Sequence, residues 1–395
     1  MGGRNKGEKT LKKDRIFTPG PTPVPLPVGL SQVRMVHHRS PEFGELLGRV
    51  LDGLKYVFQT DNEVLLFTSS GTGAMEGAVA NCFSPGDRVA VFCGGKFGER
   101  LADISESFGL DVIRVSYEWG QSADPLTAEK LLEENRDLKG VMLTQSETST
   151  GAVNDVEAFG RVVSGSDALF VVDAISGLGA VQFKTDDWNV DVAVSGSQKA
   201  LMTPPGLAFA ALSDKAWKAV ERATLPSYYF CFKTARETQQ KKPPQTPFTP
   251  AITLVQALDQ AIEMMKREGL TQIFARHRLL AEATQAAVEA LGLRFVAADR
   301  SRAFVTTSVW SPEGVDSGDL VRLMRNEYGV FIAGGQGKLK GKIFRLGHVG
   351  YFDGFDIVAQ VSALEMALGR LGYRFEVGSG VAAAQGVLVD GQEVQ

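Results

Sequence analysis

Lys199 is the residue of this chain whose surroundings most clearly indicate chemistry. It lies in residues 195–200 (SGSQKA), among small and apolar residues rather than polar ones. Removing a lysine from water lowers its pKa, and the neutral amine is then a good nucleophile. The competing interpretation is a surface lysine whose stem lies along apolar atoms while its amine reaches water.

Asp173 and Arg345 are charged residues in apolar surroundings. Asp173 ends the apolar run ALFVVD, and an acid at the carboxyl end of a buried strand lies where α/β sheets bind ligands. Arg345 interrupts the segment IFRLG, where a buried guanidinium needs a partner and its planar fork suits a carboxylate. Simpler interpretations exist, because Asp173 can cap the next helix and Arg345 can form an internal salt bridge.

Residues 69–76 (SSGTGAME) form a turn of small residues between a strand-like segment and a helical run. Such a turn presents backbone N–H groups beside a helix N-terminus, an arrangement that suits a phosphate group. It is not a Walker A loop, and Glu76 stands where the dinucleotide fingerprint needs its third glycine. A tight turn that binds nothing is the alternative.

These features indicate one chemistry together better than any of them does alone. A phosphate cradle, an acid for a ring nitrogen and a lysine able to form a Schiff base are the parts of a pyridoxal 5'-phosphate site. The carboxylate-binding Arg345 adds an amino-acid substrate.

The pattern of apolar segments predicts an α/β fold with a mostly parallel sheet. Several segments are apolar at nearly every position, as in strands covered on both faces, and most are separated by enough chain for a crossover helix. The strand candidates are residues 64–69, 88–93, 111–117, 140–145, 168–174, 191–195 and 207–212. The last two are joined by a loop too short for a helix, so one of them is expected to be antiparallel. The proline-rich residues 17–29 are expected to be extended.

A smaller α+β domain is expected toward the C-terminus. It would hold helices at 271–290, 317–327 and 354–371 and strand-like segments at 304–310, 329–333 and 343–347. The resulting division is a basic N-terminal arm (1–16), a large cofactor-binding domain (17–262), a small C-terminal domain (263–375) and a tail (376–395). The tail is rich in Gly, Ala and Val and has no clear periodicity.

Composition excludes several other classes of protein. The 42 basic and 46 acidic residues give a net charge of −4, which argues against nucleic acid as a partner. The three cysteines form no CxxC pair, so neither a disulfide framework nor a structural metal site is expected. No apolar stretch is long enough to cross a membrane, and the N-terminus lacks the apolar core of a secretory signal. The expected location is the cytoplasm.

With these motifs in order, the chain resembles the class V aminotransferases of fold type I, specifically the alanine–glyoxylate and serine–pyruvate group. The resemblance runs from about Phe17 to about Leu371. It rests on TPGPTPVP, HHRSPEF, YVFQT, SSGTGAMEG, PGDRVAV, ETSTG, VVDAISGLG, SGSQKALMTPPGL and FRLGHVG. It implies a large domain with a mostly parallel seven-stranded sheet and a smaller C-terminal α+β domain.

The resemblance also implies roles for individual residues. Lys199 would form the Schiff base with pyridoxal 5'-phosphate, and Asp173 would keep the ring nitrogen protonated. Further cofactor-binding positions are Thr72, Gly73, Ala74, Phe97, Thr148, Gln198 and Thr249. Phe97 would stack on the ring, and Ala74 stands where some relatives carry histidine. Gly20 and Arg345 would bind the substrate carboxylate. Thr249 would reach the site of a neighbouring subunit, which implies a homodimer with shared active sites.

The activity implied is a ping-pong transfer of an amino group from a small amino acid to a 2-oxo acid such as glyoxylate or pyruvate. Alanine and serine are the expected donors, and aspartate stays open, with Arg39 and Arg302 available for a second carboxylate. One alternative is a lyase of the same fold, such as a desulfurase, although Cys231 is the only cysteine after Lys199 and lies in apolar YYFCFK. The other is a non-catalytic subunit that retains the fold.

Overall fold

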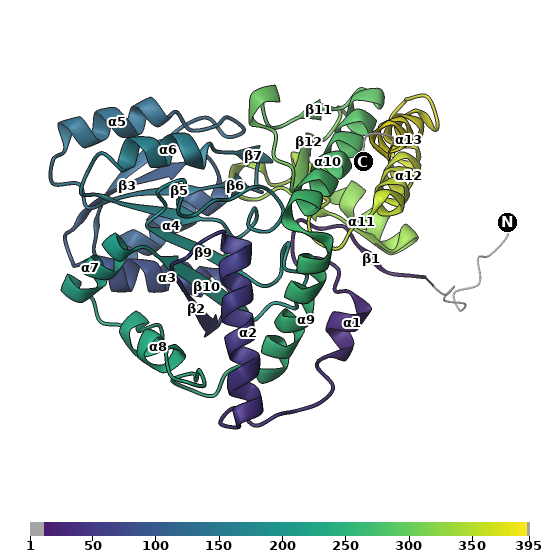
Figure 1. Ribbon diagram of the computed structural model, residues 1–395. Coiled ribbons are helices and arrows are strands. Elements are labelled where there is room, and N and C mark those ends of the chain that lie inside the picture. Colours follow the sequence, from purple (N-terminus) through teal and green to yellow (C-terminus); the bar gives the residue numbers. More distant parts are fainter. Residues whose placement is uncertain (1–11, 393–395) are drawn as a thin grey trace.

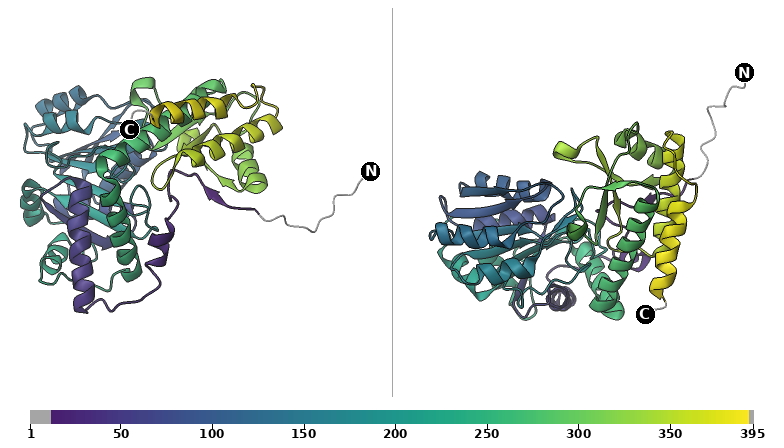
Figure 2. Two further views of the ribbon diagram at one scale, coloured as in Figure 1. Left: turned by 45° about the vertical axis from the view of Figure 1, so that its right-hand side comes forward. Right: turned by 90° about the horizontal axis from the view of Figure 1, so that it is seen from above.

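The computed structural model describes residues 12–392 of the chain and shows two α/β parts beside each other (Figures 1 and 2). Most of the basic arm (residues 1–11) and the end of the tail (393–395) lie outside the described residues. None of the helices in residues 12–392 is long and apolar enough to cross a lipid bilayer.

The large part is built around a seven-stranded sheet with the order β2-β10-β9-β8-β5-β3-β4. The strands are β2 (Glu63–Thr68), β3 (Arg88–Cys93), β4 (Asp111–Ser116), β5 (Gly140–Thr144), β8 (Leu169–Asp173), β9 (Val192–Gly196) and β10 (Leu207–Leu212). Only β10 runs antiparallel to its neighbours β2 and β9. The predicted α/β class, the mostly parallel sheet and the antiparallel last pair are therefore confirmed.

Helices cover both faces of this sheet, which explains why its strands are apolar at nearly every residue. In β8, Phe170 and Val172 pack on one face, while Leu169 and Val171 pack on the other. The first face is covered by α2 (Pro41–Phe58), α5 (Pro125–Glu134), α6 (Val156–Val163) and α9 (Ile252–Glu268). The second face is covered by α3 (Gly71–Cys82), α4 (Lys96–Ser107), α7 (Asp214–Arg222) and α8 (Phe232–Gln239).

The small part has an antiparallel four-stranded sheet with the order β11-β12-β15-β14. Its elements are α10 (Leu270–Ala290), β11 (Arg294–Phe295), β12 (Thr306–Trp310), α11 (Ser317–Tyr328), β13 (Val330–Phe331), β14 (Ala333–Gly334), β15 (Ile343–Gly347), α12 (Gly354–Arg370) and α13 (Ser379–Gln392). The N-terminal strand β1 (Arg15–Ile16) pairs in parallel with β13. Residues 15 and 16 of the basic arm therefore belong to the small part of the molecule.

Two segments differ from what the sequence predicts. Residues 17–29 are not extended throughout, because α1 (Leu26–Leu30) forms within them, with Pro25 at the N-cap and Pro27 in the first turn. Proline is tolerated there, since the first helical N–H groups have no intrahelical acceptor. The tail contains α13, which packs against α10 and α12 through Ala384 and its neighbours (Figure 2). The contacts come from one face, through Val381, Ala384, Val387 and Leu388, but the exposed positions also include apolar residues such as Ala382 and Val389, so the sequence shows no clear helical period.

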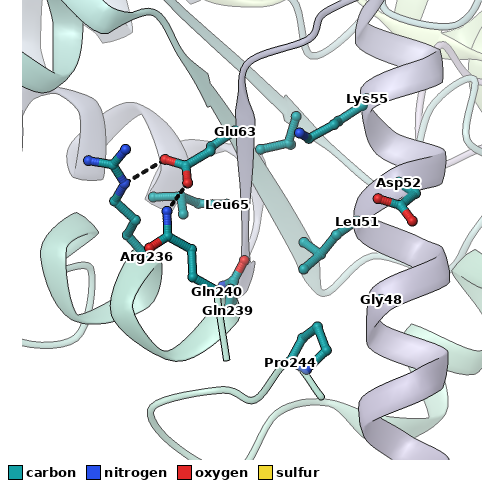
Figure 3. A pocket seen from close by; sticks show the side chains of 11 residues that line it. Gly48, Leu51, Asp52, Lys55, Glu63, Leu65, Arg236, Gln239, Gln240 and Pro244 are labelled. Atoms are coloured by element: carbon teal, nitrogen blue, oxygen red, sulfur yellow. Dashed lines mark hydrogen bonds and ion pairs between the residues drawn. The ribbon is translucent and has the colours of Figure 1, made fainter. Parts of the chain in front are cut away.

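Strand β2 is the edge of the large sheet, and a side chain covers part of that edge. The Gln239 amide donates to the Leu66 carbonyl (3.0 Å) and accepts from the Leu66 N–H (3.2 Å), as a neighbouring strand would. Beside it, Glu63 forms an ion pair with Arg236 and accepts a hydrogen bond from Gln240, at a cleft that is also lined by Leu51 and Lys55 of α2 (Figure 3). The paired edge is unavailable to a second chain.

A Gln239→Leu variant is expected to be less stable by about 2–4 kcal/mol. The substitution leaves a buried N–H and a buried carbonyl of Leu66 without partners, and each such group costs about 1–3 kcal/mol. Urea unfolding followed by circular dichroism measures the change. The matched control is Gln240→Leu, whose amide bonds Glu63 at the exposed surface. Equal losses in the two variants would contradict this account of the edge.

Candidate active site

Asp173, Lys199 and the turn before α3 lie at the carboxyl edge of the large sheet. Asp173 is the last residue of β8 and pairs with Thr144 of β5 and Val194 of β9. Lys199 follows three residues after the end of β9. The turn before α3 follows β2, and a Cβ at Gly196 would lie 3.3 Å from the backbone nitrogen of Gly71, so this turn adjoins the end of β9. The carboxyl ends of parallel strands share one edge, which is why these distant segments meet.

Lys199 is buried, with 8% of its surface exposed, rather than a surface lysine. Its Nζ donates to the Pro19 carbonyl (2.6 Å), and its own carbonyl accepts from the Thr22 hydroxyl (2.9 Å). Gly20 passes so close that a Cβ there would lie 2.5 Å from Nζ. Burial, aided by the positive charge of Arg345, lowers the pKa of Lys199 to about 8.

Labelling of Lys199 in the cofactor-free protein is expected to follow this lowered pKa. Reaction with a small aldehyde, trapped by borohydride, should rise about tenfold per pH unit below pH 8 and level off above it, because only the neutral amine reacts. The reference pKa of a lysine amine is about 10.4, so labelling of an unperturbed amine continues to rise beyond pH 8. Peptide mass spectrometry at each pH measures both, and a Lys199 profile that matches the exposed lysines would contradict the assignment.

Asp173 is also buried, with 3% of its surface exposed. One carboxylate oxygen accepts the backbone N–H of Ile175 (3.0 Å), which is the capping contact considered from the sequence. Burial raises the pKa of Asp173 to about 6, while Ile175 N–H, Lys199 and Arg100 act in the opposite direction. The carboxylate is therefore ionised at neutral pH although it lies in the interior.

The turn before α3 has the geometry of an anion cradle. Ser70 is the N-cap but makes no side-chain hydrogen bond to the first turn, so the N–H groups of Gly71 and Thr72 remain without an intrahelical acceptor. A side chain at Gly73 would collide with Ser69 and Phe230, so the turn requires glycine there. The methyl group of Ala74 packs in the apolar core between α3 and the sheet.

Arg345 projects from β15 of the small part toward the large part. Its Nε donates to the Gly334 carbonyl (2.9 Å) and a terminal nitrogen donates to the Thr148 carbonyl (3.0 Å). Within residues 12–392 no carboxylate lies within ion-pair distance of it, so the structure does not show the internal salt bridge considered from the sequence. Burial lowers the pKa of Arg345 to about 10, which still leaves the guanidinium charged at neutral pH.

Glu147 is a buried acid to which the sequence analysis assigned no role. It lies in the short strand β6 (Ser146–Glu147) and accepts the backbone N–H groups of Phe97 (2.9 Å) and Gly98 (3.0 Å) at the N-terminus of α4. Burial raises the pKa of Glu147, and these hydrogen bonds oppose the rise. The carboxylate thus fixes the backbone that carries Phe97. An acidic side chain is stabilising at a helix N-terminus. The sequence does not reveal this contact, because α4 begins about fifty residues before Glu147.

Several buried polar atoms at this edge have no protein partner. They include Thr148 Oγ1, Gln198 Oε1 and Ser195 Oγ, the side-chain oxygens of residues 144–146, and Ser308 Oγ, which belongs to the residue opposite Arg345 in the neighbouring strand β12 of the small part. Buried polar atoms are nearly always hydrogen-bonded in folded proteins, so a group of unpaired ones indicates a ligand site. Thr148 and Gln198 are two positions that the resemblance assigns to the cofactor.

Other predicted residues do not join this cluster. Thr249 is exposed and lines a groove with Thr68, Tyr229 and Phe248. Arg302 forms ion pairs with Glu289 and Asp299. Arg39 donates to the loop carbonyl of Thr246 (3.0 Å).

The chain is similar to a family of known enzymes. The family model for class-V aminotransferases matches residues 29–341. A protein of a Synechococcus species, named as the small subunit of a soluble hydrogenase, is 46% identical over 95% of this chain and 98% of its own length. An L-aspartate–glyoxylate aminotransferase of Paracoccus denitrificans is 36% identical over 94% of this chain and 95% of its own length.

A solved structure shows the same fold. The ureidoglycine–glyoxylate aminotransferase of Bacillus subtilis has a TM-score of 0.91 and 29% sequence identity, covering 96% of this chain and 99% of that chain. The predicted fold-type I architecture is thereby confirmed. With the family match spanning most of the chain, the protein is an enzyme that belongs to the class-V aminotransferases.

Proposed function

We propose that this chain uses pyridoxal 5'-phosphate to move an amino group from a small amino acid to a 2-oxo acid such as glyoxylate or pyruvate. The observation that carries the proposal is a buried lysine and a buried aspartate at one sheet edge, among polar atoms without protein partners. Alanine and serine are the proposed donors, with aspartate as a further candidate.

The residues present fit the cofactor. The N–H groups of Gly71 and Thr72, with the Thr72 hydroxyl, can hold a phosphate at the N-terminus of α3. Thr148 Oγ1 and Gln198 Oε1 are unpaired and buried, and a cofactor would supply their partners. Phe97, whose backbone Glu147 fixes, offers a ring for stacking.

When bound, pyridoxal phosphate supplies a carbonyl carbon that exchanges amino groups and a ring that accepts electrons. Lys199, with its pKa lowered to about 8, can take the proton from the substrate Cα and return it. Asp173, ionised above its pKa of about 6, can hold a proton on the ring nitrogen. Lys199 must first release the Pro19 carbonyl, to which its Nζ donates.

Arg345 is proposed to bind the substrate carboxylate, beside Gly20. An Arg345→Gln variant is expected to raise the KM for the amino donor roughly 10- to 100-fold, because a hydrogen bond to a charged group is worth about 1.5–3 kcal/mol. Steady-state kinetics measures the change. Arg345→Lys keeps the positive charge but loses the planar guanidinium, so its KM for the donor should lie between those of the wild type and Arg345→Gln. An unchanged KM in Arg345→Gln would contradict this role.

Visible absorbance tests the proposed function directly. The purified protein, incubated with pyridoxal phosphate, is expected to be coloured, to bleach with one of alanine, serine or aspartate, and to regain colour with a 2-oxo acid. Lys199→Ala should abolish the coloured species. A protein that stays colourless after incubation would contradict the proposal. Release of sulfide from cysteine would instead support the lyase alternative; Cys231 lies at the N-cap of α8 and has no place in the cluster around Lys199.

A subunit role is the second candidate, because the Synechococcus relative is named as a hydrogenase subunit. Its test is the transaminase activity of the purified protein after incubation with pyridoxal phosphate. We expect activity, and a folded protein that stays free of cofactor and transfers no amino group would favour this candidate.

We further propose a cytoplasmic homodimer in which Thr249 reaches the site of the partner. Supporting this, large apolar side chains are exposed in and after α1, at Leu26, Leu30, Val33 and Met35. A contiguous apolar segment of this kind is unusual on a monomer surface. Light scattering coupled to size exclusion should give twice the chain mass of 42.5 kDa, and a monomer mass would contradict the shared site.

A further inference from the structure

A cleft of about 670 Å³ lies at the edge of the large sheet opposite the candidate active site. It is lined by residues before β3, by the loop between α5 and β5, by the loop between α6 and β8, and by α7. Leu169 at the amino end of β8 lines the cleft, whereas Asp173 ends the same strand at the active site. Four residue steps of about 3.3 Å place the two about 13 Å apart along the strand.

The walls of this cleft are basic, although the chain as a whole is acidic. Lys215, Lys218 and Arg222 are spaced along one face of α7 at positions i, i+3 and i+7. Arg136 and Lys139 face the same cleft from the loop before β5. The cleft contains two acids, Asp87 and Asp167, against these five cations. A chain with a net charge of −4 therefore concentrates positive charge in one concavity.

Most of these cations are not neutralised by the protein. Lys215 is held by Asp191 (3.2 Å) and by the carbonyl of Ala168 (2.6 Å). In the part of the chain that the structure describes, no carboxylate lies within 4 Å of the charged groups of the other four, which are Arg136, Lys139, Lys218 and Arg222. Asp87 accepts the Ser84 N–H (2.7 Å), and neither Asp87 nor Asp167 forms an ion pair within the described residues. Unpaired cations around a concavity raise its positive potential and attract anions.

The floor of the cleft is apolar. Cys82, Leu138 and Leu169 line it and are each at most 5% exposed, and Ala219 lies beside them. The cleft thus combines an apolar floor with a basic rim, and its volume lies within the 300–1,000 Å³ range of small-molecule sites. Arginine and lysine side chains both bind phosphate groups, and arginine does so through its planar guanidinium.

We propose that this cleft binds a nucleoside polyphosphate, with its phosphates on the basic rim and its base against the apolar floor. The site is separate from the proposed catalytic site and does not depend on the proposed reaction. It would give the enzyme a second ligand on the far edge of the sheet.

Isothermal titration calorimetry with ATP tests the proposal on the full chain. The protein is first saturated with pyridoxal phosphate, so that ATP does not occupy the cradle at α3. We expect one ATP per chain, with affinity falling as salt is added, and no binding of adenosine. The double variant Lys218→Ala/Arg222→Ala should weaken ATP binding at least about tenfold, since each charge-assisted hydrogen bond is worth about 1.5–3 kcal/mol.

The matched control removes two cations elsewhere. Lys266→Ala/Arg370→Ala changes the net charge equally on α9 and α12, away from the cleft, and should alter ATP affinity less than about twofold. Thermal unfolding checks that both double variants fold. Hydrogen exchange with ATP should protect residues 135–139, 164–168 and 214–223. Absence of ATP binding, equal weakening in the control, or protection confined to residues 69–76 would overturn the proposal.

Discussion

A Lys199→Ala variant is expected to lose roughly 10²–10⁴-fold or more in transaminase turnover, the range typical of a removed acid–base group. Among the lysines of residues 12–392, this buried amine is the one affected by both Asp173 and Arg345, and its pKa of about 8 makes it effective as a base near neutral pH. Steady-state kinetics with the donor identified by bleaching measures the loss. Turnover within tenfold of the wild type would contradict the role of Lys199.

Two further measurements separate a chemical role from a structural one. Added methylamine should partly restore turnover to Lys199→Ala, because a diffusible amine can carry the proton that the side chain no longer carries. Lys184→Ala is the control, since this exposed lysine pairs with Asp187 at the surface and should leave turnover within about twofold. Failure of any amine to restore activity, with a folded variant, would indicate that Lys199 only supports the structure.

An Asp173→Asn variant is expected to lower kcat by roughly 10²–10³-fold while the KM for the donor changes only a few-fold. Asparagine has the same shape and can still accept the Ile175 N–H, but it carries no charge to hold a ring proton. The pH profile provides the second readout. Because burial places the pKa of Asp173 at about 6, its ionised fraction falls below pH 6, and wild-type kcat should fall with it. The variant should lack that dependence.

Asp191→Asn is the matched control for this prediction. Asp191 is also buried, and it directly precedes β9, the strand beside β8. It lies at the opposite edge of the sheet from Asp173, where it forms an ion pair with Lys215 and accepts a hydrogen bond from the Ser213 hydroxyl. Because the Lys215 side chain is 36% exposed, the loss should lower the free energy of unfolding by only about 1 kcal/mol, less than for a fully buried pair. It should leave kcat within about twofold. A similar fall of kcat in the two variants would indicate a general loss of structure rather than a missing charge.

The sequence predicts the large sheet well because most of its strands are short apolar runs that end at a loop, the exception being the edge strand β4. Strand β8 is an example: Phe170 and Val172 pack on one face of the sheet, and Leu169 and Val171 pack on the other. All four positions are therefore apolar, and the strand is a continuous apolar run. Helices α1 and α13 are missed for opposite reasons. The prolines of α1 mask a helix that starts at a position proline tolerates, and the small residues of α13 give no period.

The site is only partly accessible from the sequence, because its contacts join distant segments. Lys199, Asp173 and Arg345 stand out since each is a charged residue in an apolar or small-residue segment. Glu147 does not, because its partners Phe97 and Gly98 are set by folding and not by local pattern. Arg345 could be read as half of a salt bridge until the structure shows two carbonyls as its partners. Thr249 remains a prediction, since its proposed target lies on a second chain.

The position of β10 has a consequence for the order in which the protein is made. β2 is the first strand of the large sheet to be synthesised, yet its only neighbour in the sheet is β10, the last one, with Thr68 opposite Leu207. The turn at residues 69–73 is continuous with β2, so it cannot take its final position while the ribosome is still adding β10. The candidate anion cradle is therefore completed late in translation, and until then the edge of β2 depends on other contacts for protection from aggregation.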